Sequence, residues 1–178
     1  MISKKMQKAI NDQINAELHS AYLYFSMVSY FKSLTLDGFA QWMTVQTQEE
    51  IFHATKFFNF VIDRGGRALL APIEGPATEW ESPLAAFEAA YKHEQYITKR
   101  INDLLKLARQ ESDTAAEVLL QWYVTEQVEE EANADRIVNK LKLMAAAPGG
   151  LYMLDQELGT RVYTPPAGAA AGGQGARR

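Results

Sequence analysis

Glu50 and His53 are the residues whose types and spacing point most directly to metal chemistry in this chain. They stand three positions apart, so on a helix they project from nearly the same face. Phe39, Met43 and Phe57 continue that face in steps of three and four, which predicts that the face is buried. A carboxylate and an imidazole in an apolar interior are costly unless something pairs with them. Taken alone, the pair is most simply interpreted as a core histidine satisfied by a neighbouring glutamate.

The elements that must position these residues are helices, because apolar residues recur at helical spacing along most of the chain. Ser3 and Ser82, the second followed by a proline, are N-cap residues at the predicted starts of two helices. Gly65–Gly66 is a predicted helix end. The predicted helices cover about residues 4–32, 37–64, 82–110, 114–146 and 151–158.

These lengths predict an all-α protein built as a four-helix bundle with a short fifth helix near the C-terminus. The first two helices are joined by a short connection, which implies antiparallel neighbours. The segment 67–81 contains two prolines and a glycine and has no helical period. A connection of that length can run along the whole bundle, which makes the second and third helices parallel.

Each of the four long helices carries polar side chains near its midpoint, on the face that is otherwise apolar. These interruptions are Glu17, then Gln46, Glu50 and His53, then Glu94, then Gln127 and Glu130. In a bundle of helices of nearly equal length, the midpoints share one level whichever way each helix runs. A register error of two residues moves a group by only about 3 Å, so the side chains are expected to converge.

Four carboxylates in a dry interior cannot all stay ionised without compensation, because burial and mutual repulsion both penalise the charge. Two divalent cations would balance them. With an imidazole nitrogen from His53 and an amide oxygen from Gln127 added, the ligand set suits iron, manganese or zinc better than calcium or magnesium. The sequence therefore predicts a two-metal site inside the bundle.

Composition excludes several other classes of protein. The 178 residues include no cysteine, which rules out disulfides, thiolate zinc sites and a rubredoxin-type iron site. The net charge of −4 argues against nucleic acid as a partner. No stretch approaches the roughly 20 apolar residues that a membrane span needs. A cytoplasmic protein is expected.

The chain resembles ferritins of the non-haem bacterial and archaeal type over about residues 1–163. The resemblance includes the long crossover, the short fifth helix and the run Glu-Gln-Val-Glu-Glu at 126–130. Many ferritin-like bundles carry two Glu-x-x-His pairs, whereas this chain has Gln127-x-x-Glu130 as its second pair. That departure favours ferritin over bacterioferritin and rubrerythrin. Ile51 stands where bacterioferritins have a haem-ligating methionine, so no haem is expected. The Pro/Gly/Ala-rich tail, 164–178, is expected to be disordered.

The resemblance also implies roles for single residues. Glu17, Glu50 and His53 would bind a first iron, with Glu50 bridging to a second iron held by Glu94 and Glu130 and flanked by Gln127. Further residues implied by the resemblance are Glu49, Glu126 and Glu129 for a third iron site, and Tyr24, with Trp122 as a weaker candidate, as a site partner and electron donor. His19 and His93 lie off the apolar faces and are expected at the surface.

The implied activity is that of a ferroxidase, in which Fe(II) is oxidised by dioxygen or peroxide and the ferric product is stored as mineral. The container would be a hollow homo-oligomer of 24 subunits. Two alternatives remain open from the sequence: a peroxidase of the rubrerythrin type, and a bundle that buffers metal without turnover. Aerobic addition of Fe(II) to the apoprotein distinguishes them.

Overall fold

The computed structural model describes residues 1–144 and 147–165, which form five helices and no strand. The helices are α1 (Lys4–Ser33), α2 (Asp37–Asp63), α3 (Pro83–Gln110), α4 (Thr114–Met144) and α5 (Gly150–Leu158). The predicted all-α class and the five predicted helices are confirmed, with ends that agree within one or two residues. The expected extension of the fourth helix to Ala146 and the part of the predicted disordered tail at 166–178 lie outside the described residues.

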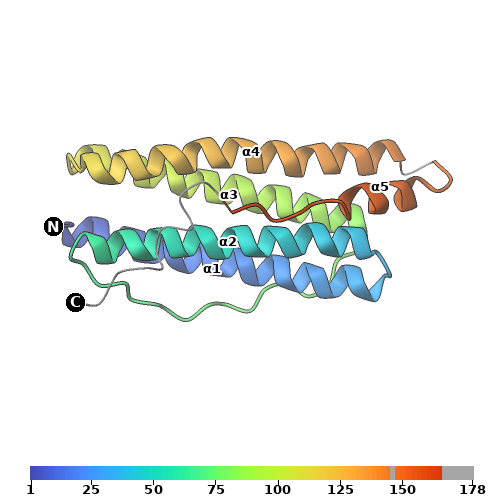
Figure 1. Cartoon of the computed structure of the whole chain (residues 1–178), viewed down its shortest axis with the longest axis horizontal. Helices are drawn as coiled ribbons and strands as arrows, with labels where there is room; N and C mark the ends of the chain where they lie inside the picture. The colour runs from blue at the N-terminus through green and yellow to red at the C-terminus, as the bar shows by residue number, and fades with distance from the viewer. Residues whose placement is uncertain (145–146, 166–178) are drawn as a thin grey trace, which may run out of the picture.

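The four long helices form two antiparallel hairpins that pack into one bundle (Figure 1). α1 packs against α2 and α3 against α4, and α1 also contacts α3. The crossover between α2 and α3 runs the length of the bundle, so these two helices are parallel, as predicted (Figure 1). α5 folds back at the end of α4 and contacts both α2 and α4.

The predicted helix caps are present. The Ser3 hydroxyl accepts a hydrogen bond from the backbone amide of Met6 at 3.1 Å, and the Ser82 hydroxyl accepts one from Ala85 at 3.0 Å. At the end of α2, Gly65 adopts a φ of 71°, which is in the left-handed region that glycine enters without steric cost. These residues fix where the helices start and stop, and therefore which residues reach the bundle midpoint.

The crossover is held against α1 by side-chain hydrogen bonds to its backbone carbonyls. Asn15 donates to the carbonyl oxygens of Ala71 and Pro72, both at 3.1 Å, and Ser26 donates to Ala77 at 2.7 Å. A segment without helix or strand must satisfy its backbone polar groups in this way or with water.

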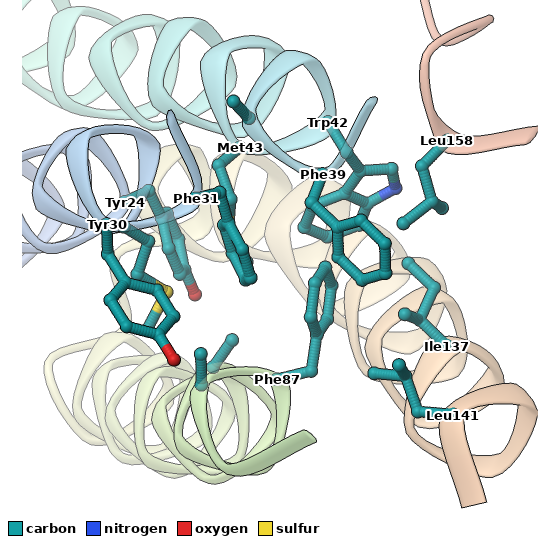
Figure 2. Close-up of a cluster of buried hydrophobic side chains, with 14 of the residues drawn as sticks. Tyr24, Tyr30, Phe31, Phe39, Trp42, Met43, Phe87, Ile137, Leu141 and Leu158 are labelled. Carbon is teal, nitrogen blue, oxygen red and sulfur yellow. The ribbon is translucent and has the colours of Figure 1, made fainter. Parts of the chain in front are cut away.

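The apolar core is divided into two clusters along the bundle axis. One cluster lies at the end near α5 and includes Phe31, Phe39 and Phe87, whose ring centroids are 5.2 to 5.7 Å apart (Figure 2). The other lies at the opposite end, where Phe57 and Tyr123 stack with their centroids 4.0 Å apart. On every long helix, the predicted metal ligands fall in sequence between the residues of one cluster and those of the other. The two clusters therefore enclose a polar layer at mid-height.

None of the helices among the described residues is long and apolar enough to cross a membrane.

Candidate metal centre

All six side chains predicted to form the two-metal site are buried, and they come from all four long helices. Their exposed fractions are 1% for Glu17, 2% for Glu50, 2% for His53, 3% for Glu94, 3% for Gln127 and 5% for Glu130. Polar residues at these levels of burial in one layer of a bundle need partners. The arrangement of those partners defines what the site can do.

Glu17, Glu50 and His53 form one compact group. A carboxylate oxygen from each glutamate and a ring nitrogen of His53 all lie within 4.8 Å of one another. His53 Nδ1 is 3.6 Å from Glu50 Oε2. The Oε2 atoms of Glu17 and Glu50 are buried and have no hydrogen-bond partner. These two acceptor atoms, next to an imidazole nitrogen, are suited to a cation.

Glu94 is held from two sides. The Tyr24 hydroxyl donates a hydrogen bond to Glu94 Oε1. The Gln127 amide nitrogen donates to Glu94 Oε2 at 3.2 Å and lies 3.3 Å from the Thr98 hydroxyl oxygen. Tyr24 and Gln127 therefore both contact the carboxylate of Glu94, one at each of its oxygen atoms.

Glu130 contacts the buried residue Gln46 and also lies in one group with the half-buried Glu126. Gln46 donates to Glu130 Oε2 at 2.7 Å. Glu130 also forms a second compact group with His53 and Glu126, again with ligand atoms within 4.8 Å of one another. His53 thus lies between two groups of carboxylates.

The electrostatics of the site favour a bound cation. Burial, then repulsion from Glu50, raises the pKa of Glu17 to about 8. Burial also raises the pKa of Glu50 and of Glu130 well above the ordinary value, and repulsion from Glu94 adds to both shifts. Burial raises the pKa of Glu94 as well, although the hydrogen bonds from Tyr24 and Gln127 oppose the shift. A raised pKa means that each carboxyl binds a proton more tightly than it does in water, so a bound metal ion would compete with that proton.

The three residues predicted for a third site are placed differently from one another. Glu126 is half-buried and belongs to the group with His53 and Glu130. Glu49 is half-buried and its Oε2 lies 2.5 Å from Nη2 of Arg161. Glu129 is exposed and belongs to neither group. Among the described residues, the three carboxylates therefore do not form one cluster.

The sequence also predicts positions for Trp122, near the site, and for His93, at the surface. Trp122 lies beside the site, with its ring centroid 5.6 Å from that of His53 and Lys56 Nζ 4.2 Å above its ring. His93 was expected at the surface, and the structure places it half-buried. Its Nε2 lies 2.8 Å from the Ser20 hydroxyl, and burial together with His19 lowers the pKa of His93 to about 4.

Sequence reasoning assigned no role to Gln13 and Gln46, which are 0% and 1% exposed. Gln13 donates to Glu17 Oε1 at 2.8 Å and Gln46 donates to Glu130. A signal for them existed: Gln13 stands four residues before Glu17 and Gln46 stands four residues before Glu50, so each glutamine shares a helix face with a predicted ligand.

Four buried carboxylates, an imidazole and an amide, contributed by four helices at one level, define a four-helix bundle with a carboxylate-rich centre that could hold metal ions. This donor set fits iron by its hard oxygen atoms and its nitrogen. The calcium alternative fits less well because calcium prefers oxygen ligands throughout.

Comparison with known proteins identifies the family within this class. The family model for the ferritin-like domain matches residues 7–144. A bacterial non-heme ferritin of Bacteroides fragilis is 44% identical over 161 residues, which are 90% of this chain and 100% of the relative. An open pore ferritin from the hyperthermophilic archaeon Archaeoglobus fulgidus has a TM-score of 0.89 and 56% identity, covering 91% of this chain and 99% of that one. A humanized archaeal ferritin has a TM-score of 0.91 and 57% identity, covering 93% and 100%.

The chain belongs to the ferritin family, and its function is iron storage. The resemblance inferred from the sequence is thereby confirmed.

Proposed function

We propose that the protein is a ferroxidase, which oxidises Fe(II) with dioxygen at the buried centre and passes the ferric product to a storage cavity. The observation that carries the proposal is the pair of partnerless buried oxygen atoms, Oε2 of Glu17 and Oε2 of Glu50, beside His53. A buried acceptor without a donor costs free energy, and a ferrous ion between these atoms removes that cost.

Each ligand has a proposed role. Glu17, Glu50 and His53 hold the first ferrous ion. Glu94 and Glu130 hold the second. Glu50 bridges the two ions, because its carboxylate is close enough to raise the pKa of Glu17 at the first position and of Glu130 at the second. Gln127 flanks the second position, where an amide is a weaker ligand than a carboxylate. The second position is therefore the weaker one, which suits a centre that must release its product.

The two ferrous ions are substrates, and each gives up one electron. Together they supply the two electrons that convert dioxygen and two protons to hydrogen peroxide, so that no one-electron product needs to leave the centre. Tyr24, which donates to Glu94, is the proposed side chain for a further electron. Glu49, Glu126 and Glu129 are proposed to hold iron on its way out, and the grouping of Glu126 with His53 and Glu130 supports the first step of that route.

Storage needs a container, and we propose a hollow homo-oligomer of 24 subunits in the cytoplasm. Exposed apolar side chains support contacts between subunits: Phe25 on α1 is 62% exposed and Leu70 on the crossover is 64% exposed. When exposed apolar side chains lie together in one large patch, they indicate a surface that another chain covers. Light scattering tests the oligomer, and a monomer or dimer at all salt concentrations would contradict it.

The activity is tested by adding Fe(II) to the apoprotein in air and following the ferric absorbance. The wild-type protein should oxidise Fe(II) faster than buffer does. Glu50→Ala should abolish the fast phase while leaving the oligomer intact. Glu88→Ala is a matched control, because Glu88 is a surface residue of α3 paired with Lys142, and it should oxidise like wild type. Equal rates for Glu50→Ala and wild type would show that the ligand assignment is wrong.

A further inference from the structure

Two buried glutamines each connect a predicted iron ligand to an arginine on another element. Gln13 Nε2 donates to Glu17 Oε1 at 2.8 Å, and Gln13 Oε1 accepts from Arg100 Nε, also at 2.8 Å. The second connection has the same order of groups. Gln46 Nε2 donates to Glu130 Oε2 at 2.7 Å, and Gln46 Oε1 accepts from Arg161 Nη1 at 2.8 Å.

The arginine decides which end of each amide faces the ligand. A glutamine amide has an acceptor oxygen and a donor nitrogen of nearly the same shape, so by itself it can present either end. A guanidinium has only donors. With the guanidinium on one side, the amide oxygen must turn toward the arginine and the NH₂ group toward the glutamate.

This orientation gives one oxygen of each carboxylate a hydrogen-bond donor. Glu17 Oε1 is occupied by Gln13, whereas Glu17 Oε2 is buried without a partner, and Glu17 belongs to the group with Glu50 and His53. Glu130 Oε2 is likewise occupied by Gln46, and Glu130 takes part in the group with His53 and Glu126. The glutamines therefore turn a specific carboxylate oxygen toward the metal position.

The arginines are themselves anchored. Arg100 on α3 donates through Nη2 to the backbone oxygen of Asp12 at 2.9 Å and lies over the Tyr96 ring. Arg161, which follows α5, lies 4.3 Å above the Trp42 ring and pairs with Glu49. The first connection therefore joins Glu17 to α3, which carries no predicted ligand of the first iron. The second joins Glu130 to the segment after α5, which carries no predicted ligand of the second iron.

We propose that Arg100 and Arg161 are positioning residues of the iron centre, acting through Gln13 and Gln46 to aim Glu17 and Glu130 at the metal positions. The inference rests on the proposed ferroxidase function. It gives the segment after α5 a function, because Arg161 of that segment contacts Gln46. Residues that hydrogen-bond to metal ligands, as Gln13 and Gln46 do here, usually change metal affinity about 10- to 100-fold when they are replaced.

The first test uses Co(II) under anaerobic conditions, with the visible absorption of the bound ion as the readout. Arg100→Leu should weaken Co(II) binding at the stronger position about 10- to 100-fold and change its spectrum. Arg100→Lys should keep most of the affinity, because an ammonium also has only donors to offer the amide oxygen. Arg109→Leu is the matched control, since Arg109 pairs with Glu117 at the far end of the bundle, and it should bind Co(II) like wild type. Equal dissociation constants for Arg100→Leu and Arg109→Leu would overturn the proposal.

The second test asks whether each arginine acts through its glutamine. Gln13→Leu should weaken binding as much as Arg100→Leu does, and the double variant should be no weaker than Gln13→Leu alone. If the two losses add, the arginine acts by its charge alone and the proposal is wrong. Circular dichroism of every variant identifies loss of folding, and Arg100→Lys keeps the test decisive if the leucine variants unfold.

The connection through Arg161 needs one further precaution, because Arg161 also pairs with Glu49. Arg161→Leu and Gln46→Leu should therefore be compared in a Glu49→Gln background. Both should weaken the second Co(II) position to the same extent without additivity. Failure of the proposed function has a different signature: the wild-type protein would bind two Co(II) ions per subunit and yet not accelerate Fe(II) oxidation.

Discussion

Asp155 on α5 caps α2 by accepting a hydrogen bond on Oδ1 from the backbone amide of Gly38, at 2.8 Å. The same oxygen accepts from the amide of Phe39 at 3.1 Å. The residue at the N-cap position of α2 itself, Leu36, supplies no side-chain hydrogen bond. A residue 117 positions along the chain therefore satisfies the first turn of the helix that carries Glu50 and His53.

Replacing Asp155 should destabilise the subunit. Asp155→Ala removes both hydrogen bonds and a negative charge at a helix N-terminus, and should lower the free energy of unfolding by about 1 to 2 kcal/mol. Asp155→Asn should cost less, because the amide oxygen still accepts. Urea unfolding measures both. Glu157→Ala, two residues further along, is the control because Glu157 makes a surface pair with Lys140, and a loss as large as that of Asp155→Ala would contradict the capping role.

Gly38 should tolerate no side chain. A Cβ at this position would lie 1.6 Å from the backbone oxygen of Asp155, so Gly38→Ala must push α5 away from α2. We expect it to lower the free energy of unfolding by more than Asp155→Ala does. Gly75→Ala, where a Cβ would meet nothing within 4 Å, should be nearly neutral. Similar midpoints for the two alanine variants in urea would contradict the close approach.

Acid should weaken the start of α4. Burial alone would raise the pKa of Asp113, but the hydrogen bonds from Arg64 and the Ala116 amide, with the guanidinium charge, outweigh it and lower the pKa below the ordinary value. A carboxyl with a lower pKa in the folded state stabilises the protein above its unfolded pKa, and loses that effect as the pH falls through the folded pKa.

Asp113→Asn should therefore be less stable than wild type by about 1 kcal/mol at pH 7, because the neutral amide has one acceptor oxygen and no charge to offer the two N–H groups of Arg64. The difference should shrink as the pH falls below about 4, because the wild-type carboxyl also becomes neutral. Urea unfolding from pH 7 to pH 2 measures the gap. Asp63→Asn, an exposed position in the last turn of α2, serves as the control, and its difference from wild type should change little with pH. A gap for Asp113→Asn that widens in acid would contradict the sign.

The fold and most of the centre were predictable from the sequence because the helices are long and nearly equal. An uninterrupted helical period fixes which face each residue occupies, and equal lengths bring the midpoints to one level. This reasoning found Glu17, Glu50, His53, Glu94 and Glu130 as buried neighbours. It could not fix the exact limits of each apolar face: on α3 the structure buries Leu104 and leaves its neighbour Leu105 half-buried.

The contacts that were not predictable join residues far apart in sequence through flexible side chains. Nothing in the local pattern shows that Arg161 reaches Gln46, or that Asp155 reaches Gly38, because both contacts depend on how α5 docks on α2. The half-buried position of His93 was not predicted, for a similar reason. Its partner Ser20 lies on α1, and only the packing of α1 on α3 brings the two together.

Tyr24 should matter for iron oxidation beyond its contribution to the core. Its hydroxyl donates to Glu94 Oε1 in the buried layer, so Tyr24→Phe leaves that oxygen without its donor while keeping the ring. We expect Fe(II) oxidation, followed by stopped-flow absorbance, to slow about tenfold. Tyr30→Phe makes the same chemical change in the apolar cluster near α5 and should leave the rate unchanged. Because the removal of one hydroxyl costs only about 1 kcal/mol of stability, both variants should fold. Equal oxidation rates for the two would mean that Tyr24 is a core residue with a satisfied hydroxyl and takes no part in the reaction.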